Sequence, residues 1–436
     1  MSFSKHGLYF EEYLKPRYSS TGMKDLLTLK LLPYLDGIYR NDLLLLIGRK
    51  PHEEPSVDGV FLSHIHQDHS AFIALLDERI PVSCSYITEA YAKAILESGR
   101  RTLETEVYNF KKRPLVDRKV PPIQRTFKQL ESEKTTKTGS IEIEPLSVDH
   151  SVPGAMAFLI HTSEKTLVYT GDFRLRGACG YLTKKLLDTL AKEDVDLMLC
   201  EGTSIHENEN QTEEYVEKNA DNVVSRCKQL VVADFAHKDL HRLLTFYKVA
   251  SGNNRKIVIS KRHAYLLNEL RNIPEIGKVM PRIDDENILI YVERKDTGRY
   301  VQSDYDGWEK DIIEMSNTVK ADWIHDNQEK VIVCFTFFDI NELIDIAPSS
   351  GSVYIHSSSE PHNEEQIIDV GRLNNWIDFF GLEKHHFHAS GHASGPEIGE
   401  VIQIVNPREL VPIHTEHPEL FKRMHNNVSM PKLETF

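Results

Sequence analysis

Four side chains that can bind a metal ion lie within six consecutive residues, and they are the strongest chemical feature of this sequence. They are His64, His66, Asp68 and His69. An apolar run, residues 60–62, precedes them and predicts a β-strand. Alternate residues of a strand point to the same side, so His64 and His66 leave the strand end in one direction. Imidazole nitrogen and carboxylate oxygen together favour zinc, manganese or iron. This spacing predicts a metal site rather than a histidine-rich surface loop.

Three more candidate ligands come from distant parts of the chain, each directly after an apolar run. They are His150, Asp172 and His414. His150 precedes a Pro-Gly turn, and Asp172 follows Gly171, which would let the backbone turn tightly. A single histidine at a strand end is usually structural. Because four separate strand ends each supply a metal-binding residue, we expect these ends to meet at one site.

Length and composition indicate a globular protein of two domains. A chain of 436 residues exceeds one ordinary hydrophobic core, and 40% hydrophobic with 27% charged residues is typical of soluble proteins. The apolar run 43–47 is only of strand length, and residues 1–6 lack the features of a signal peptide. The five cysteines are scattered and form no CxxC pair, as expected for buried thiols in a reducing cytosol. We therefore expect a cytoplasmic protein.

The net charge of −14 argues against a protein that holds nucleic acid by overall basicity. A nuclease with this charge needs a local basic surface. The candidates are residues 111–113, 118–119 and 261–263, and the alternative for each is an ordinary solvated face.

The order of apolar runs predicts two kinds of architecture along the chain. Expected strands at 141–148, 156–161, 166–170 and 197–200 lie close together, and an acidic, polar stretch at 207–211 then marks a domain junction. Beyond it, strands alternate with helices, which predicts an α/β unit with a mostly parallel sheet. The expected strands there are 230–232, 256–259, 288–292 and 331–334, with helices at 240–250 and 264–271. A further strand at 352–355 precedes a helix at 364–379.

The run from His64 to His69 resembles the HxHxDH signature of the metallo-β-lactamase fold, and the later strand ends follow in that fold's order. The resemblance implies an α/β protein with an αββα sandwich and a two-metal hydrolytic site at one edge of its sheets. Two such cations would activate a shared water and neutralise a phosphoryl transition state. One ion would be held by His64, His66 and His150, the other by Asp68, His69 and His414, with Asp172 as the bridge. The implied ions are Zn²⁺, with Mn²⁺ as the alternative.

Three residues resemble motifs A, B and C of the β-CASP branch of this fold, which processes nucleic acids. They are Glu201, His392 and His414. The run from His388 to His392, followed by Pro-Ile-His, is most similar to the ribonuclease J group. The resemblance implies a metallo-β-lactamase domain at 1–205, an inserted β-CASP cap at 206–375 and a return segment at 376–436. Two departures are the Asp36-Gly37 pair, which precedes the apolar run instead of ending it, and the loop 356–360, which replaces a Gly-Ser-Gln-Gly-like loop.

The resemblance also assigns roles to individual residues. His392, with its ring oriented by Glu201, would protonate the leaving 3′ oxygen, since a histidine pKa lies near neutral. The resemblance implies that Asp68 is a catalytic residue as well as a metal ligand. Substrate phosphate would contact four residues, namely His388, Ser390, Ser357 and Ser358.

We therefore expect a metal-dependent ribonuclease that acts on single-stranded RNA in RNA processing or decay, as a 5′-to-3′ exonuclease or also as an endonuclease. The alternatives are a DNA nuclease of the Artemis-like branch, a metallohydrolase of a smaller substrate, and a scaffold without activity. The resemblance implies a homodimer.

Overall fold

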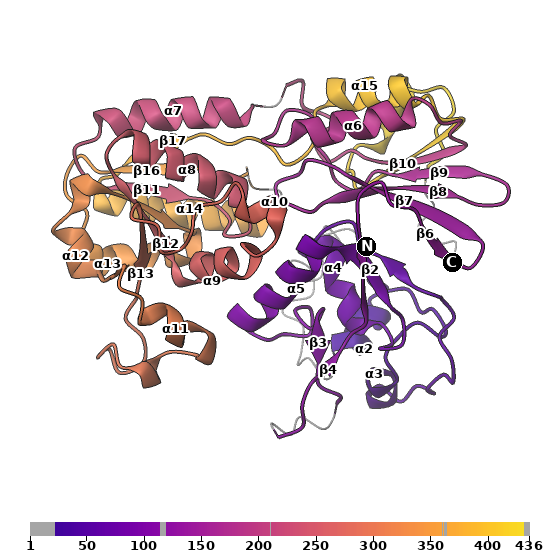
Figure 1. Ribbon diagram of the computed structural model, residues 1–436, viewed down its shortest axis with the longest axis horizontal. Helices are drawn as coiled ribbons and strands as arrows, with labels where there is room; N and C mark the ends of the chain where they lie inside the picture. The colour runs from indigo at the N-terminus through magenta and orange to yellow at the C-terminus, as the bar shows by residue number, and fades with distance from the viewer. Residues whose placement is uncertain (1–21, 114–118, 210, 360, 362–363, 431–436) are drawn as a thin grey trace. The chain divides into compact units, whose positions relative to one another are not determined.

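The computed structural model describes residues 22–113, 119–209, 211–359, 361 and 364–430, and it divides into two compact units (Figure 1). The first unit holds residues 1–175, 179–210 and 391–436, and the second holds 176–178 and 211–390. The signal-peptide expectation rests on residues outside the described ranges. No helix within those ranges is long and apolar enough to cross a membrane.

Two facing β-sheets form the first unit. A six-stranded sheet has the order β18-β10-β9-β8-β7-β6, and a three-stranded sheet has the order β1-β2-β5. Side chains from both sheets meet in one buried cluster, which includes Leu130, Ile143 and Phe158. Helix α6 packs on β7 of the larger sheet, and α5 packs on β2 and β5 of the smaller one. This is the αββα arrangement that the sequence predicted.

The strands of the first unit are β1 Val60–Phe61, β2 Val82–Ser85, β3 Asn109–Phe110, β4 Ile123–Gln124, β5 Phe127–Leu130, β6 Thr136–Thr138, β7 Ile141–Ser147, β8 Met156–His161, β9 Thr166–Tyr169, β10 Leu197–Glu201 and β18 Glu409–Ile413. Its helices are α2 Gly22–Thr28, α3 Asn41–Leu46, α4 Gln67–Ser70, the 3-10 helix η1 Ala71–Leu75, α5 Tyr86–Ser98, α6 Gly180–Leu190, α15 Gly395–Val405 and the 3-10 helix η6 Pro418–Arg423.

Four strands of the larger sheet run in the same direction, and this places their carboxyl ends together. Strands β9, β10 and β18 are mutually parallel. Strand β8 is antiparallel to both β7 and β9, so β7 runs with β9. The residues that follow β7, β9 and β18, together with the last residue of β10, therefore lie at one edge of the sheet. These are the strand ends that carry the candidate ligands.

The apolar run at 43–47 is not the strand that we expected, because it lies largely in helix α3. Leu43 and Leu44 are buried, whereas Leu45 is 60% exposed. A run of leucines fits a helix as well as a strand, and here the buried leucines pack with residues of α2 and η1 in a separate cluster.

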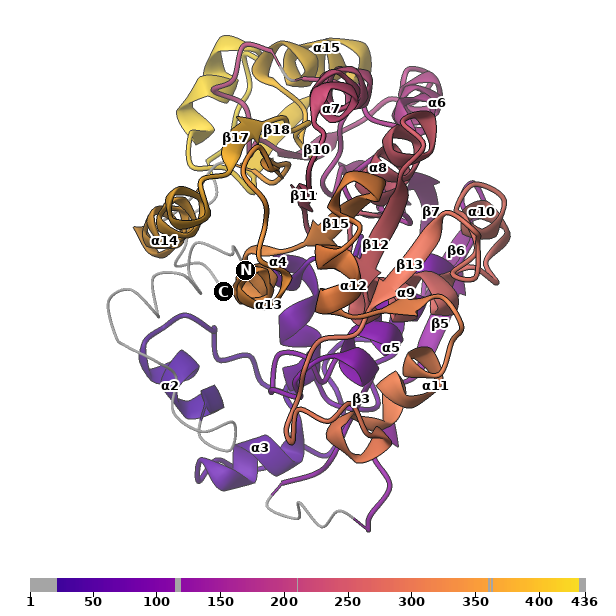
Figure 2. The ribbon, with the colours of Figure 1, turned by 90° about the vertical axis from the view of Figure 1, so that its left-hand side faces the viewer.

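The second unit is built on a seven-stranded sheet in which every paired neighbour is parallel, as the sequence predicted (Figure 2). Its order is β14-β13-β12-β15-β11-β16-β17. The central strand β15 is completely buried, which explains its continuous apolar run. On one face of the sheet, Val232 and Val333 pack with Leu373 of α14. Helix α8 contacts strands β12 and β15.

The strands of this unit are β11 Val231–Asp234, β12 Lys256–Ser260, β13 Ile288–Tyr291, β14 Thr318–Val319, β15 Val331–Phe335, β16 Val353–His356 and β17 Glu383–His386. Its helices are α7 Glu213–Arg226, α8 Leu240–Gly252, α9 Lys261–Leu270, α10 Pro274–Gly277, α11 Lys310–Ile313, α12 Ala321–His325, α13 Leu343–Ile346 and α14 Glu364–Phe380, with 3-10 helices η2 Gln302–Asp304, η3 Gly307–Glu309, η4 Gln328–Lys330 and η5 Phe337–Glu342.

The expected domain boundaries differ from the two units at the second junction. The expected first boundary, at residue 205, lies near the end of the first segment of the sandwich at Asn210. The expected return at 376 falls inside α14, and the second unit continues to Ser390. The reason is β17, an edge strand missed in the sequence, which pairs with β16 and keeps its segment in the second unit.

Candidate metal centre

The seven candidate ligands meet at one edge of the first unit and fall into two overlapping groups. One group is His64, His66, His150 and Asp172; the other is Asp68, His69, Asp172 and His414. Within each group, the possible ligand atoms lie within 4.8 Å of one another. Asp172 belongs to both groups, so it is placed to bridge two ions. The resemblance implied the same division of these residues between two ions, and that assignment stays a prediction.

Local backbone geometry brings five of these residues to the edge. His64 and His66 follow β1, while Asp68 and His69 lie in the short helix α4. Gly171 has a φ of +56°, and a Cβ on it would lie 2.8 Å from the Met156 carbonyl oxygen. A side chain at that position would clash with β8 and would strain the backbone. Glycine therefore allows the tight turn that places Asp172 close to the end of β9.

The histidine nitrogens of the first group face one another, which fits a shared metal ion. His66 Nδ1 lies 3.1 Å from His64 Nε2 and 2.9 Å from His150 Nε2. His64 is fully buried and His150 is 1% exposed. Burial, with neighbouring imidazoles, holds the pKa of both rings well below the ordinary value. Both rings are therefore neutral, which is the form of histidine that binds a metal.

The carboxylates of the site are ionised despite their burial. Asp172 is 2% exposed, and its Oδ2 lies 3.1 Å from His69 Nε2 and 3.5 Å from His64 Nε2. Burial alone would raise its pKa, but the surrounding histidines hold that pKa well below the ordinary value. Its Oδ1 is buried and accepts no hydrogen bond from the described residues. An ionised oxygen of this kind, between two groups of imidazoles, fits a bridging ligand.

Second contacts fix the orientation of the ligand rings. His150 Nδ1 donates to the Gly391 carbonyl oxygen over 2.6 Å, which leaves its Nε2 as the metal-binding atom. Ser63 Oγ lies 3.1 Å from His64 Nδ1, and Thr203 Oγ1 lies 2.7 Å from His414 Nδ1. Such contacts select the tautomer and angle of a metal-binding histidine.

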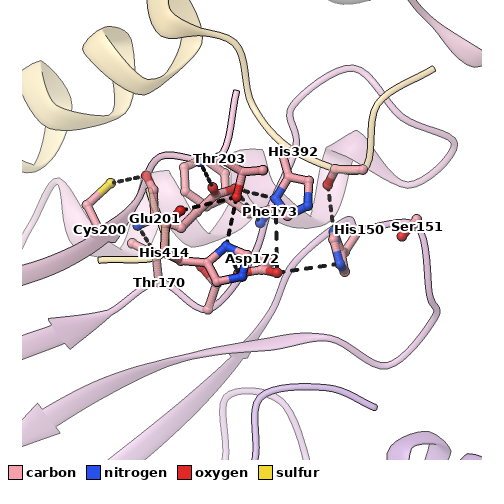
Figure 3. A network of polar contacts seen from close by, with 12 residues as sticks. His150, Ser151, Thr170, Asp172, Phe173, Cys200, Glu201, Thr203, His392 and His414 are labelled. Carbon is pink, nitrogen blue, oxygen red and sulfur yellow. Dashed lines mark hydrogen bonds and ion pairs between the residues drawn. The ribbon is translucent and has the colours of Figure 1, made fainter. Parts of the chain in front are cut away.

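Glu201 and His392 form a pair beside the ligands, as Figure 3 shows. Glu201 is fully buried at the end of β10, and its Oε1 lies 3.2 Å from His392 Nδ1. The same carboxylate accepts backbone N–H groups from Phe173 and Thr203, so its position is fixed. Burial opposes protonation of His392, but Glu201 outweighs it and raises the pKa of the ring. His392 Nδ1 is also 4.0 Å from Asp172 Oδ2.

Thr203 is a residue of this site that the sequence reasoning missed. His414 has a φ of +49°, a left-handed conformation that is uncommon for residues other than glycine. The Thr203 hydroxyl contacts both the ring and, over 3.2 Å, the carbonyl oxygen of His414, as the close-up shows (Figure 3). The signal was its place two residues after Glu201, directly beyond the strand that pairs with β18.

The four expected phosphate contacts lie in the second unit and differ in availability. Ser357 is 2% exposed, and its hydroxyl donates to the Phe387 carbonyl oxygen and accepts from Arg242. That hydroxyl is committed to the fold, so Ser357 is a poor phosphate ligand. His388 Nδ1 lies 3.2 Å from the Ser357 carbonyl oxygen, and burial lowers its pKa to about 3. Ser358, Ser390 and the uncharged His388 ring stay candidates for the phosphate contact.

The expected basic surfaces are partly structural. Lys261 and His263 are 3% and 1% exposed, so residues 261–263 do not form an open basic face. Arg113 pairs with Glu106 over 3.0 Å, with little of either side chain exposed. Residues 114–118 lie outside the described ranges, and with them part of the candidate segment 118–119.

Comparison with known proteins agrees with this geometry. Residues 35–233 match the beta-lactamase superfamily domain, and residues 382–424 match the Zn-dependent metallo-hydrolase RNA specificity domain. Ribonuclease J 2 of Streptococcus pyogenes is 26% identical over 84% of this chain and 60% of its own length. Ribonuclease J of Sinorhizobium meliloti is 22% identical over 89% of this chain and 62% of its own length. These matches make the chain similar to ribonuclease J of the β-CASP group over most of its length.

A solved structure supports the same fold. A protein of unknown function from Enterococcus faecalis superposes with a TM-score of 0.69 at 20% identity, over 94% of this chain and 88% of that one. The expected metallo-β-lactamase fold is thus confirmed. The chain spans less than two thirds of the length of the two ribonuclease J relatives named above.

Proposed function

We propose that this protein hydrolyses phosphodiester bonds of single-stranded RNA with two divalent metal ions, most readily Zn²⁺, with Mn²⁺ as the alternative. The observation that carries the proposal is Asp172, which two groups of ligands share, with the His392–Glu201 pair beside it. Relatives named ribonuclease J, and the match to an RNA specificity domain, support RNA as the substrate.

The roles of the side chains follow from the contacts of the site. When bound, two divalent ions supply activation of water and charge neutralisation at the scissile phosphate. Asp172 would hold both ions, and Asp68 with His69 and His414 would fix the second one. Glu201 holds His392 Nδ1 and so fixes the orientation of the ring beside the ligands. Because Glu201 raises the pKa of His392, the ring can keep a proton and give it to the leaving 3′ oxygen.

We propose a 5′-to-3′ exonuclease with products that carry a 5′ phosphate. A terminal phosphate would be held by Ser358, Ser390 and His388 in the second unit, and Ser357 is left out because its hydroxyl is already bonded. Homodimer formation is part of the same proposal, on the resemblance to ribonuclease J.

The decisive experiment uses matched single-stranded RNA and DNA, each 5′-monophosphorylated, with Zn²⁺ or Mn²⁺ added. Asp172→Ala and His392→Ala serve as inactive variants, and bis(p-nitrophenyl) phosphate tests a small substrate. Release of mononucleotides from RNA alone, lost in both variants, is the expected result. Discrete internal fragments would change the mode to endonuclease, and equal cleavage of DNA would change the polymer. Turnover of the small diester without cleavage of either polymer would overturn the ribonuclease proposal.

A further inference from the structure

The second unit contains a cavity whose lining shares only Ser358 with the residues proposed above to hold a phosphate. Its volume is about 650 Å³, within the range of small-molecule sites. The walls come from the residues at and after the carboxyl ends of five parallel strands, β11, β12, β13, β15 and β16. Open parallel sheets bind their ligands at this edge, because the loops there are free to diverge while the strands hold them in place.

The two lysines in the wall are neutralised by carboxylates. Lys261 is 3% exposed, and its Nζ lies 2.8 Å from both Glu293 and Glu309. Lys295 Nζ lies 2.9 Å from both oxygens of Glu309. Glu309 itself is 1% exposed. This cluster therefore offers a phosphate little uncompensated positive charge.

The lining as a whole is acidic. It contains six carboxylate residues and three basic ones. Glu342 accepts a hydrogen bond from the Tyr291 hydroxyl over 2.7 Å, and Asp234 pairs with His356 over 2.8 Å. Burial, with further carboxylates nearby, raises the pKa of Glu342. Polar groups of this kind accept hydrogen bonds from N–H donors and disfavour an anion.

Aromatic side chains supply the flat surfaces of the cavity. Phe337, Phe338 and Trp308 belong to the lining, and Phe338 is 82% exposed. The rings of Phe337 and Phe338 meet edge to face, with centroids 5.5 Å apart. A large apolar ring left this open at the mouth of a cavity is suited to stacking on a planar ligand.

We propose that this cavity binds a nucleobase that carries an exocyclic amino group. The aromatic walls would stack on the ring, and the carboxylates would accept its N–H groups, as acidic side chains accept from cytosine N4. The choice of a nucleobase over other planar amines rests on the proposed ribonuclease function. The base belongs either to a free nucleoside or to the RNA strand.

The test measures binding of cytidine and uridine to the full-length protein by calorimetry and tryptophan fluorescence. All three tryptophans lie at positions 308, 323 and 376, so the fluorescence reports on the second unit alone. We expect cytidine to bind and uridine to bind at least about tenfold more weakly, since uracil lacks the amino group. Phe338→Ala should weaken cytidine binding on the order of 10- to 100-fold. Glu342→Gln, which replaces an acceptor oxygen by a donor, should weaken it as well.

A matched control and a second ligand separate the outcomes. Ile344→Ala changes another exposed apolar residue, 61% exposed and outside the lining, and should bind cytidine like the parent. Short oligocytidylate and oligouridylate form the second arm. If Phe338→Ala weakens binding of oligocytidylate but not of cytidine, the site binds a base of the RNA strand. If it weakens binding of both cytidine and oligocytidylate, the site binds the base in either form. Binding that ignores both cavity variants, or that favours uridine, overturns the proposal.

Failure of the proposed function would be visible separately. Nucleoside binding needs no hydrolysis, so it is also measured in Asp172→Ala, where it should persist. Binding without ribonuclease activity would leave this cavity assignment standing and remove only its link to RNA. Ribonuclease activity without binding of nucleosides or oligonucleotides at the cavity would overturn the cavity assignment and leave the proposed function standing.

Discussion

The two units differ in how their buried polar side chains are paired. In the first, ring nitrogens of His64, His66 and His150 point at one another, and an ionised Asp172 lies beside them. In the second, the buried Lys261 already lies between Glu293 and Glu309. Nitrogen facing nitrogen is a poor hydrogen-bonded arrangement but a good set of metal ligands, whereas lysine between carboxylates is complete as folded. The difference indicates that the first unit, and not this cluster of the second, is built to take up a cation.

The largest expected effect comes from removing the ligand that both groups share. Asp172→Ala should lower RNA hydrolysis to background and reduce the bound metal measured by mass spectrometry. Since every tryptophan lies in the second unit, its fluorescence-detected unfolding should stay unchanged. Full metal content in this variant would contradict the role of Asp172 as a bridge.

His392 should separate catalysis from metal binding. His392→Gln keeps a polar side chain but removes the proton donor, and we expect hydrolysis to fall about 10²- to 10⁴-fold. Metal content should match the parent, because His392 is outside both four-residue groups that share Asp172 and contacts Glu201 instead. Loss of metal together with activity would show that His392 supports the ligands rather than the leaving group.

The contrast between the units also explains what could be predicted from the sequence. The candidate centre was visible because His64, His66, Asp68 and His69 are adjacent, and because each later ligand ends an apolar run. The parallel sheet of the second unit was visible from its alternating strands and helices. Within that sheet, however, β17 is mostly polar at an edge and carries no apolar signal.

Tertiary contacts account for the features that the sequence did not reveal. The cavity of the second unit takes one residue from the end of each of five strands, together with residues of the following segments and of α14, so no local pattern marks it. Lys261 appeared to belong to a basic face, and only the fold shows that Glu293 and Glu309 neutralise it. The run that forms helix α3 was expected to be a strand, because consecutive leucines fit the periodicity of a helix as well as that of a strand. The packing of Leu43 and Leu44 against α2 favours the helix.

The compensated cluster of the second unit can be broken in turn. Lys261→Met would leave the buried Glu309 with Lys295 as its remaining lysine partner, and we expect the second unit to lose about 3 kcal/mol of stability. Urea unfolding followed by tryptophan fluorescence measures this loss. Lys295→Met is the control, since Lys295 is 32% exposed and should cost less. Equal or greater stability of Lys261→Met would show that the ion pair gives no net stabilisation.

The same cluster has a defined response to pH. Burial would raise the pKa of Glu309, but Lys261 and Lys295 outweigh it and hold that pKa below 4.5. A lowered carboxylate pKa contributes stability that is fully present above the unfolded value and is lost as the pH falls through the folded value. The parent should therefore lose stability below about pH 4.5, and Lys261→Met should lose less over the same interval.

The smallest effect should come from Thr203, which holds a ligand without being one. Thr203→Val keeps the shape of the side chain but removes the hydroxyl that contacts the ring and carbonyl oxygen of His414. The left-handed backbone of His414 then loses a restraint, and we expect metal affinity of the group containing Asp68 and His69 to fall about 10- to 100-fold. Competition with a chelator measures this affinity, and the group containing His64 serves as the internal reference. Thr203→Ser should restore most of the affinity, because it returns the hydroxyl. If the Thr203→Val and Thr203→Ser variants bind metal equally well, the orientation of His414 is set by its own backbone and not by Thr203.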